Sequence, residues 1–344
     1  MIRVAINGYG RIGRVAHRVI LEKFSKDIEV VAINAGSSTD LQGWAYLLKY
    51  DTVYGPLNNT TIQAEANQKG SQLGYIIVGE ERIPVFSEKD PTKLPWKDLD
   101  IGVVIESTGK FLTEEKAKMH IVAGAKKVVL SAPAKEEAIP TYVVSVNAQR
   151  YKGEQVISNA SCTTNCITPV AAILEKHFGI EKAMMTTIHA YTSDQQLQDG
   201  GHKDYRRARA AGQNIIPTST GATKAAALAL PALKDVFGGL SLRVPVIVGS
   251  LSDFTFLLKK ETTKEEVNKA LQKASEEEYK GIVEVTSDPI VSSDIIGNAH
   301  SAIVDLLLTQ VVGGKMAKVI AWYDNEWGYA NRLVEEVLLV GKNV

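Results

Sequence analysis

The chain has 344 residues, of which 45% are hydrophobic and 23% charged, as in a globular protein with a substantial core. This length predicts two domains, or one large α/β unit with an insertion. The 39 basic and 39 acidic residues leave no net charge, which argues against a protein that coats nucleic acid or an acidic membrane. The charge balance favours a small-molecule partner.

The cysteine content and the hydropathy pattern bear on the compartment. The chain has two cysteines, Cys162 and Cys166, too few for a secreted disulfide scaffold. The N-terminal apolar run is short and breaks at Asn7-Gly8, unlike a signal peptide, and no stretch is long enough to cross a membrane. We therefore expect a cytoplasmic protein with no membrane partner.

The N-terminal half alternates strand and helix patterns. The apolar runs Ile2–Ile6 and Ile28–Ile33 predict buried strands, and Arg11–Phe24 between them has apolar residues at helical spacing. Strand, turn, helix and strand within about thirty residues form a βαβ unit. Further helices are predicted over 41–50 and 113–123, and further strands over 101–106, 127–130 and 142–146. The whole indicates a mostly parallel, doubly wound sheet.

The pattern changes near residue 160. An apolar helical stretch runs to Phe178, and strand-like runs follow over 183–191, 240–248, 252–258 and 318–322. Few helices separate these runs, which favours an antiparallel or mixed sheet. The polar segment Thr192–Gln213 is a long loop of the kind that is often functional. A closing helix is predicted over 325–340.

Three glycines, Gly8, Gly10 and Gly13, form G-x-G-x-x-G between the first strand and the first helix. The first glycine permits a tight turn, the second lets the backbone approach a pyrophosphate, and the third lets helix and strand pack closely. The helix N-terminus then offers N–H groups to the phosphates. This context predicts a dinucleotide site, with a glycine-rich turn that binds nothing as the alternative.

These patterns define an α/β fold with two domains. We predict a Rossmann-type dinucleotide-binding domain over residues 1–160, completed by the C-terminal helix within 325–344. We predict an α+β catalytic domain with a mixed or antiparallel sheet over 161–324.

The end of the second strand bears on the choice of cofactor. An NAD site normally has Asp or Glu there to bind the ribose 2′-hydroxyl. The segment Asn34–Thr39 has no carboxylate before Asp40, and it contains three consecutive hydroxyl residues able to bind a 2′-phosphate. We expect NADP or NAD, with NADP favoured. The alternative is a polar turn that lost its acid without a change of cofactor.

Cys162 precedes the apolar helical stretch, and a thiol at a helix N-terminus has a lowered pKa and a larger thiolate fraction. Pro169 either kinks a helix that begins at Cys162 or marks the first turn of a later one. His189, at the end of a strand, can act as the base, although two buried structural residues are the alternative. Cys166 is predicted to be a small buried residue, and no metal site is expected because suitably spaced ligands are lacking.

Anion-binding candidates lie further along the chain, at Thr192, Arg207, Thr220-Gly221 and Arg243. Arg207 belongs to the basic run His202–Arg209. Arginine pairs well with phosphate oxygens, which predicts a phosphorylated substrate. A solvated basic loop or an RNA-binding patch is the alternative.

These residues occur within longer motifs, and the chain resembles the glyceraldehyde-3-phosphate dehydrogenase family over essentially its whole length. The matching stretches are Ala5–Arg14, Ser158–Cys166, His189–Thr192, Arg206–Ala211, Pro217–Gly221 and Trp322–Tyr329. Several long motifs in the right order are far more specific than any one of them.

The resemblance implies a role for each matching residue. Cys162 is implied as the nucleophile and His189 as its base. The attacking inorganic phosphate is implied to bind Ser161, Thr163, Thr220 and Gly221, and further phosphate contacts are implied for Thr192, Arg207 and Arg243. Arg11 and Ile12 match pyrophosphate-contacting positions, and Ser131 and Asn325 match positions near the nicotinamide. The resemblance also implies a homotetramer in which the loop over 192–216 lies against a neighbouring subunit.

Two departures from the NAD-specific members concern the cofactor. Ala35 stands where those members have the ribose-binding Asp, and Gly200-Gly201 replaces a Leu-Pro pair that would crowd a 2′-phosphate. The similar NADP-preferring members share this kind of change. Arg82 is predicted to supply the missing positive charge.

The implied reaction converts glyceraldehyde 3-phosphate, inorganic phosphate and NAD(P)⁺ reversibly to 1,3-bisphosphoglycerate through a thioester on Cys162. The closest alternative is an erythrose-4-phosphate dehydrogenase, in which water hydrolyses the thioester. A semialdehyde dehydrogenase is disfavoured by the sequence around Cys162. A non-catalytic nucleotide-sensing or RNA-binding relative is disfavoured by the zero net charge and by the presence of Cys162, His189 and Arg243.

Overall fold

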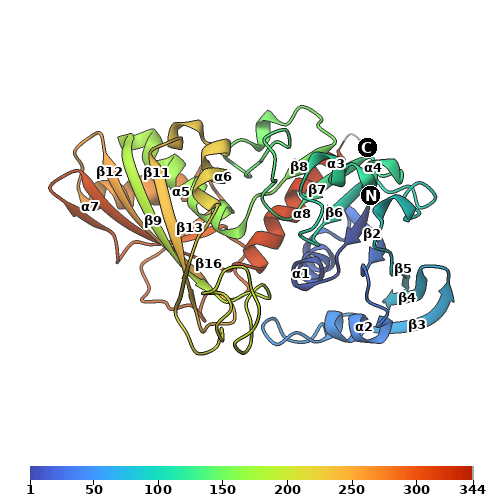
Figure 1. Ribbon diagram of the computed structural model, residues 1–344. Coiled ribbons are helices and arrows are strands. Elements are labelled where there is room, and N and C mark those ends of the chain that lie inside the picture. The colour runs from blue at the N-terminus through green and yellow to red at the C-terminus, as the bar shows by residue number, and fades with distance from the viewer. Residues whose placement is uncertain (343–344) are drawn as a thin grey trace. The chain divides into compact units, whose positions relative to one another are not determined.

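In the computed structural model, which describes residues 1–342, the N-terminal apolar run forms the inner strand β1 (Ile2–Asn7) of an eight-stranded sheet (Figure 1). The strand order is β3-β4-β5-β2-β1-β6-β7-β8. Parallel pairing joins β1 to β2 (Ile28–Asn34) and to β6 (Val103–Glu106), and continues through β7 (Lys127–Leu130) to β8 (Val156–Ser158). These strands are buried on both faces, which explains their unbroken apolar runs. The prediction of a mostly parallel, doubly wound sheet is confirmed.

Two helices of this unit begin at side-chain caps, and one begins at the glycine turn. The long predicted first helix is α1 (Arg11–Val19) continued by a π-helical turn, η1 (Ile20–Phe24). Asp40 caps α2 (Leu41–Lys49) by accepting a hydrogen bond from the backbone N–H of Gly43. The helix predicted over 113–123 is instead two short helices, α3 (Glu114–Ala117) and α4 (Met119–Val122). The remaining elements are α8 (Trp327–Gly341) and the 3₁₀ turns η2 (Pro91–Lys93) and η3 (Ala148–Arg150).

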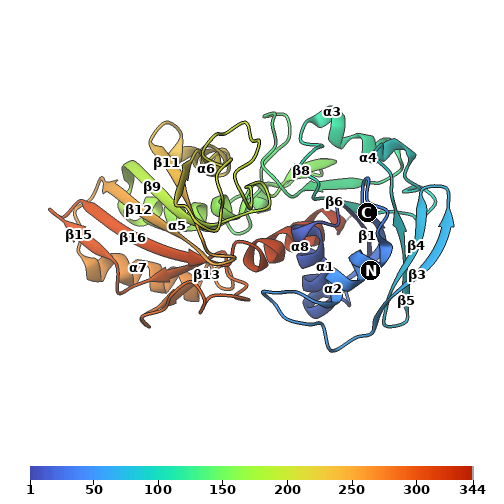
Figure 2. The same cartoon turned by 60° about the horizontal axis from the view of Figure 1, so that its bottom comes forward.

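Two parts of the sheet differ from the prediction. The prediction omits an antiparallel meander at one edge, formed by β3 (Ile62–Lys69), β4 (Gln72–Val78) and β5 (Glu81–Phe86) and visible in Figure 2. The strand predicted over 142–146 is wrong, because the side chain of Asn147 accepts a hydrogen bond from the N–H of Val143 and closes a turn there. The last parallel strand is β8 instead.

The C-terminal half forms a second, mixed sheet in the order β10-β11-β9-β12-β16-β14-β13, with β15 paired to β16. Its strands are β9 (Ile180–Ala190), β10 (Ile216–Thr218), β11 (Phe237–Val244), β12 (Ser250–Leu258), β13 (Val283–Thr286), β14 (Ala302–Asp305), β15 (Gln310–Val312) and β16 (Met316–Tyr323). Its helices are α5 (Cys162–Phe178), α6 (Ala222–Ala229), α7 (Lys264–Glu276) and the 3₁₀ turn η4 (Pro231–Leu233). The predicted mixed or antiparallel sheet is therefore confirmed.

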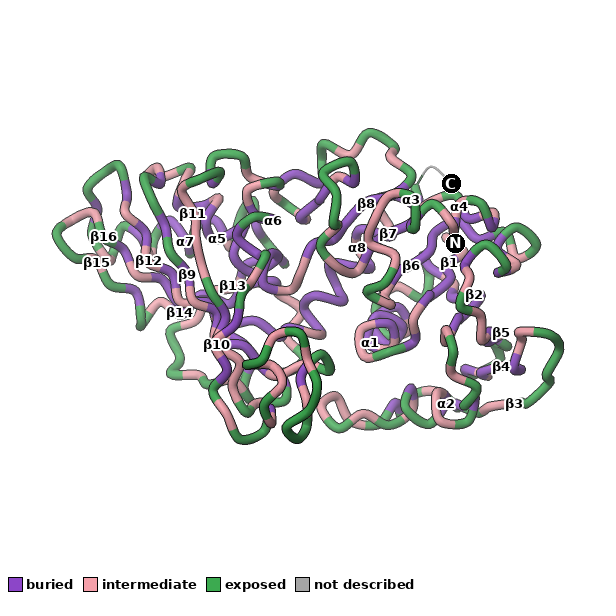
Figure 3. Tube along the Cα trace, in the orientation of Figure 1, coloured by how far each residue is buried: buried purple, intermediate pink, exposed green. Residues whose placement is uncertain are grey.

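The two faces of this second sheet differ in burial. Alternate residues of β12 are buried, and Phe254 and Phe256 pack with α5 and α7 in one apolar cluster. On the opposite face Met184 and Leu240 are exposed. Figure 3 shows the burial of each residue along the chain. One face of the sheet thus carries the core, and the other leaves these apolar side chains exposed among residues 1–342.

The described chain divides into two units. The first comprises Met1–Tyr142, Arg150–Ala160 and the chain from Ala330, and the second comprises Val143–Gln149 and Ser161–Tyr329. The part of the chain that returns to the first unit begins at Ala330, within α8. Among the described residues no helix combines the length and the apolar character needed to cross a membrane.

Candidate active site

Cys162 is the first residue of α5, in the second unit. The preceding Ser161 has extended backbone angles, and its hydroxyl oxygen accepts a hydrogen bond from the N–H of Thr164, 3.1 Å away. This N-cap fixes the start of the helix. The helix thus begins at Cys162 and contains Pro169 in its interior, which decides between the two alternatives that Pro169 leaves open in the sequence. The thiol lies at the positive end of a 17-residue helix.

His189, at the end of β9, lies beside this thiol. Its Nε2 is 3.3 Å from the Sγ of Cys162, and its Nδ1 is 2.6 Å from the carbonyl oxygen of Ala190. The carbonyl of Ala190 only accepts and favours a proton on Nδ1, whereas the Arg243 guanidinium, 2.8 Å from the same nitrogen, only donates and favours the other tautomer. With the proton on Nδ1, Nε2 can accept the proton of the thiol. Nucleophile, base and an orienting group are therefore brought together.

Burial shifts both titrating groups toward their neutral forms. Burial raises the pKa of the Cys162 thiol, against the opposing effects of the Arg243 charge and of the hydrogen bond with Thr163. This direction is opposite to the one predicted from the helix N-terminus alone, because removal of water disfavours the thiolate. Burial, followed by the Arg243 charge, lowers the pKa of His189 to about 3. His189 is therefore neutral at physiological pH and ready to take a proton.

A buried tyrosine that the sequence analysis does not assign supports the pair. The hydroxyl of Tyr323 is 2.9 Å from Thr163 Oγ1 and 2.8 Å from Thr187 Oγ1, and its ring meets that of His189 edge to face. It thus ties the first turn of α5 to β9. The only signal in the sequence is its place in the motif Trp322–Tyr329.

Two arginines gather near His189. The parallel register of β9 and β11 pairs Arg243 with His189, and Arg243 Nη1 is 2.8 Å from His189 Nδ1 and 3.1 Å from the carbonyl oxygen of Ala190. Arg207 donates to Asp194 at 2.7 Å and to Thr218 at 2.9 Å. Its charge also lowers the pKa of His189, as a later contribution after burial and Arg243. Both cations therefore act on the environment of the base.

A second helix N-terminus lies close to that of α5. Gly221 is the N-cap residue of α6, and the hydroxyl of Thr220 accepts a hydrogen bond from the N–H of Ala222. The Thr164 hydroxyl donates to the carbonyl of Ala222 at 3.4 Å, which joins the first turns of the two helices. Two helix N-termini and nearby arginines suit a phosphate group.

The remaining predicted residues of this unit flank β9. Thr192 follows it by two residues, and its carbonyl accepts a hydrogen bond from the N–H of Gln195. Asn325 accepts hydrogen bonds through Oδ1 from the N–H of Gly249 and from the hydroxyl of Ser250. Ser250 Oγ also accepts from the N–H of Ala190, next to His189. The amide of Asn325 is thereby oriented with its carbonyl engaged, so its NH₂ is the group available to donate to a ligand.

The glycine turn in the first unit has the shape that a dinucleotide requires. Gly8 has φ +97°, and a Cβ on Gly13 would lie 2.2 Å from the carbonyl oxygen of Gly8, whereas a Cβ on Gly10 would meet nothing within 4 Å. Gly10 provides no side-chain cap to α1. Arg11 and Ile12 are the first residues of α1, and no side chain of the glycine turn covers their backbone N–H groups. These residues fit a nicotinamide dinucleotide.

Other predicted cofactor residues also lie at the carboxyl ends of the parallel strands of this sheet. Ser131 directly follows β7, and its N–H donates to the carbonyl of Glu106 at the end of β6. Ala35 follows β2, and its N–H donates to the carbonyl of Phe86. The first carboxylate after Ala35, Asp40, caps α2 and so serves a structural purpose. Ligands of such sheets bind at the carboxyl ends of the strands.

The structure does not bring Arg82 to these strand ends. β2 and β5 run parallel with Asn34 opposite Phe86, so Arg82 lies at the far, amino end of β5. There it pairs with Glu65 at 2.5 Å and stacks on Tyr75. The prediction for Arg82 is therefore not supported. Lys89 is exposed and directly follows Glu88, whose backbone is hydrogen-bonded to the side chain of Asn34. Lys89 is 55 residues from Asn34 in the sequence, so its place near the end of β2 could not be predicted from the sequence and follows from the pairing of Glu88 with Asn34.

Comparison with known proteins gives matches to both units. A family model described as "Glyceraldehyde 3-phosphate dehydrogenase, NAD binding domain" matches residues 2–114, and one described as "Glyceraldehyde 3-phosphate dehydrogenase, C-terminal domain" matches residues 161–325. The glyceraldehyde-3-phosphate dehydrogenase of Mycobacterium avium is 51% identical over 348 residues, and glyceraldehyde-3-phosphate dehydrogenase 2 of Streptomyces avermitilis is 50% identical over 345 residues. Each alignment covers 100% of this chain and 99% of the relative.

Proposed function

Because the chain belongs to the glyceraldehyde-3-phosphate dehydrogenase family of oxidoreductases, we propose that it oxidises glyceraldehyde 3-phosphate with NAD(P)⁺ and inorganic phosphate to 1,3-bisphosphoglycerate, reversibly. The observation that carries the proposal is the 3.3 Å contact between Cys162 Sγ and His189 Nε2 at the N-terminus of α5. A nucleophile with a neutral base in reach is what covalent aldehyde chemistry needs.

Cys162 and His189 divide the chemistry between them. As Sγ bonds to the aldehyde carbon, His189 Nε2 takes the thiol proton and returns it to the carbonyl oxygen, which gives a hemithioacetal. His189 then takes the hydroxyl proton as the carbon becomes a thioester. The nicotinamide, when bound, accepts the hydride lost at this step. Inorganic phosphate attacks the thioester carbon, and protonated His189 can stabilise the oxyanion that forms. The carbon–sulfur bond then breaks, His189 returns its proton to the Cys162 sulfur, and the product is an acyl phosphate.

Phosphate binding is proposed for two groups of residues. The first turns of α5 and α6 supply Ser161, Thr163, Thr220 and Gly221 for the attacking phosphate. Arg207, Arg243 and Thr192 are proposed for further phosphate contacts. The hydrogen-bonded link between the two helix starts and the proximity of both arginines to His189 support this assignment. Two anionic groups need a site rich in N–H donors and fixed positive charge.

For the cofactor we propose NADP in preference to NAD. Two carboxylates near the end of β2 are engaged within the protein, since Asp40 caps α2 and the carboxylate of Glu88 accepts a hydrogen bond from the N–H of Asp90. The exposed cation in the segment that flanks Asn34 is Lys89, which replaces Arg82 in this proposal. We propose that Ser131 and Asn325 bind the cofactor near its nicotinamide.

We also propose that the chain assembles with copies of itself, as a homotetramer, and acts in the cytoplasm. The support for assembly is the uncovered face of the second sheet, where Met184 and Leu240 are 63% and 43% exposed. Large exposed apolar side chains gathered on one sheet face are typical of an interface.

The test is a set of initial rates with glyceraldehyde 3-phosphate, with NAD or NADP, in the presence and absence of inorganic phosphate. We expect turnover to require phosphate and kcat/KM to be higher with NADP. Ala35→Asp should reverse the cofactor preference, while Glu29→Gln, at the opposite end of β2, should leave it unchanged. A preference of the natural chain for NAD would remove the cofactor proposal alone. Turnover without phosphate would favour the erythrose-4-phosphate alternative.

A further inference from the structure

The segment that follows α2, residues 49–57, is tied to α1 at two points seven residues apart. Arg11 is the first residue of α1, and Arg18 lies near its end. Seven residues are close to two helical turns, so both side chains lie on one side of the helix. Both reach the segment 49–57, which therefore braces the length of α1.

The contact made by Arg18 is a buried backbone anchor. Arg18 is 2% exposed, and its guanidinium donates to the carbonyl oxygens of Leu48 at 2.7 Å, Lys49 at 3.1 Å and Gly55 at 2.9 Å. These carbonyls include the last ones of α2, which have no partner within that helix. Arg18 thus holds the start and the end of the segment.

The contact made by Arg11 is an ion pair with Asp51. The side chain of Asp51 is 4% exposed and that of Arg11 is 26% exposed. Asp51 also accepts hydrogen bonds from the N–H groups of Val53 at 2.9 Å and Tyr54 at 3.0 Å, which fix its carboxylate. The ring of Tyr54 lies 5.2 Å from the Arg11 guanidinium carbon. Arg11 is therefore held by the Asp51 carboxylate and by the ring of Tyr54, and both belong to a turn that backbone hydrogen bonds to Asp51 fix in place.

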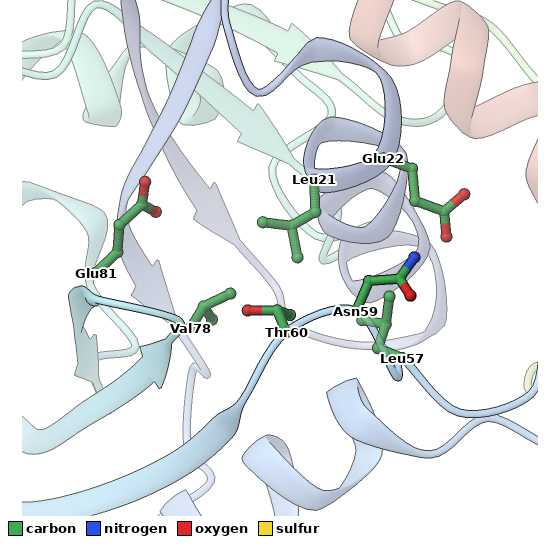
Figure 4. A pocket seen from close by; sticks show the side chains of 7 residues that line it. All are labelled: Leu21, Glu22, Leu57, Asn59, Thr60, Val78 and Glu81. Carbon is green, nitrogen blue, oxygen red and sulfur yellow. The ribbon is translucent and has the colours of Figure 1, made fainter.

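The end of this segment, at Leu57, lines a cavity. This cavity of about 680 Å³ lies between η1 and the meander, and is lined by Leu21, Glu22, Leu57, Asn59, Thr60, Val78 and Glu81 (Figure 4). Side chains that face a cavity lack packing partners on that side. Leu57 is the residue of the segment that lines this cavity, so the end of the segment has little packing there, and the polar contacts of Arg18 and Asp51 help to hold the segment in place.

We propose that Asp51 is a positioning residue for the dinucleotide, which acts through Arg11 by holding the first turn of α1 in the geometry that receives the phosphates. This inference rests on the proposed function. A helix start that is already fixed does not have to be ordered when the ligand binds, and ordering costs affinity. Removal of the charge of Asp51 should therefore weaken dinucleotide binding about fivefold, the factor expected for one partly buried ion pair.

The test is titration of the full-length enzyme with NADP and with NAD, followed by calorimetry, together with the Tm of each variant. The variants are Asp51→Asn and Asp51→Ser, which both remove the charge and both keep an oxygen that can accept from the N–H groups of Val53 and Tyr54. The matched control is Glu29→Gln, which removes the Arg3–Glu29 pair at the amino ends of β1 and β2. We expect weaker binding and a higher KM for the dinucleotide in both Asp51 variants, with little loss of kcat, and natural affinity in the control.

A thermodynamic cycle with Arg11→Ala separates positioning from a general effect on folding. If Asp51 acts through Arg11, the Asp51 substitutions should cost no further affinity in the Arg11→Ala background. Natural affinity in both Asp51 variants, or a loss of Tm alone, would overturn the inference, and so would an equal loss of affinity in both backgrounds. Failure of the natural chain to bind any dinucleotide would instead remove the proposed function, and this inference with it.

Discussion

Replacement of His189 by glutamine tests the proposed chemistry most directly. Glutamine keeps the size and a hydrogen-bonding end near Cys162 Sγ, at present 3.3 Å from His189 Nε2, but it cannot accept a proton. A positioned general base contributes about 10²–10⁴ in rate, or roughly 3–5 kcal/mol of transition-state stabilisation. Because His189 takes a proton at two steps of the proposed scheme, we expect the loss in kcat/KM to lie in the upper half of that range.

The assay is single-turnover formation of the reduced dinucleotide at pH 8, with His177→Gln as the control. His177 lies at the opposite end of α5 from Cys162, and the control should retain natural activity. Since burial lowers the pKa of His189 to about 3, protonation of this group should not reduce the rate of the natural enzyme between pH 5 and 9. A His189→Gln rate within tenfold of the natural one would refute the assignment of His189 as the base.

Three further predictions concern stability and binding. Gly13→Ala should abolish dinucleotide binding in titrations and lower stability by about 1–3 kcal/mol, since its Cβ would lie 2.2 Å from the Gly8 carbonyl oxygen. Tyr323→Phe should cost about 1–3 kcal/mol in denaturant unfolding, because Thr163 and Thr187 lose a shared partner. Glu336 is fully buried, its oxygens have no partner among residues 1–342, and burial, then the charge of Glu335, raises its pKa. Its raised folded-state pKa makes stability fall as pH rises above about 4.3, by up to ~1.4 kcal/mol per pH unit, so the Tm gain of Glu336→Gln should grow from pH 5 to 8. A gain that is constant with pH would contradict this account.

Local patterns in the sequence were sufficient for the first βαβ unit and for the nucleophile. Apolar runs bounded by Asn7-Gly8 and by Asn34 predicted β1, α1 and β2, because a buried parallel strand and an amphipathic helix each impose their own spacing on the sequence. The same reasoning failed at residues 142–146, where the apolar residues fit a strand and the Asn147 side chain closes a turn instead. It also missed the meander β3–β5, although β4 and β5 contain buried apolar residues; only β3 is mostly polar and exposed, and its pairing with β4 makes it the sheet edge.

The environment of the site was decided by the tertiary structure. Strand register places Arg243 beside His189, across 54 residues of sequence, and places Arg82 at the wrong end of β5 for a cofactor contact. Burial reverses the shift in the Cys162 pKa that the helix position alone predicts, because desolvation depends on every side chain packed around the thiol. The contacts of Tyr323 with Thr163 and Thr187, and the ion pair of Asp51 with Arg11, likewise join segments that are distant in the sequence. The sequence by itself determined which groups can react, since that depends on residue type and local spacing, whereas pairing, burial and charge around them depend on contacts between distant segments.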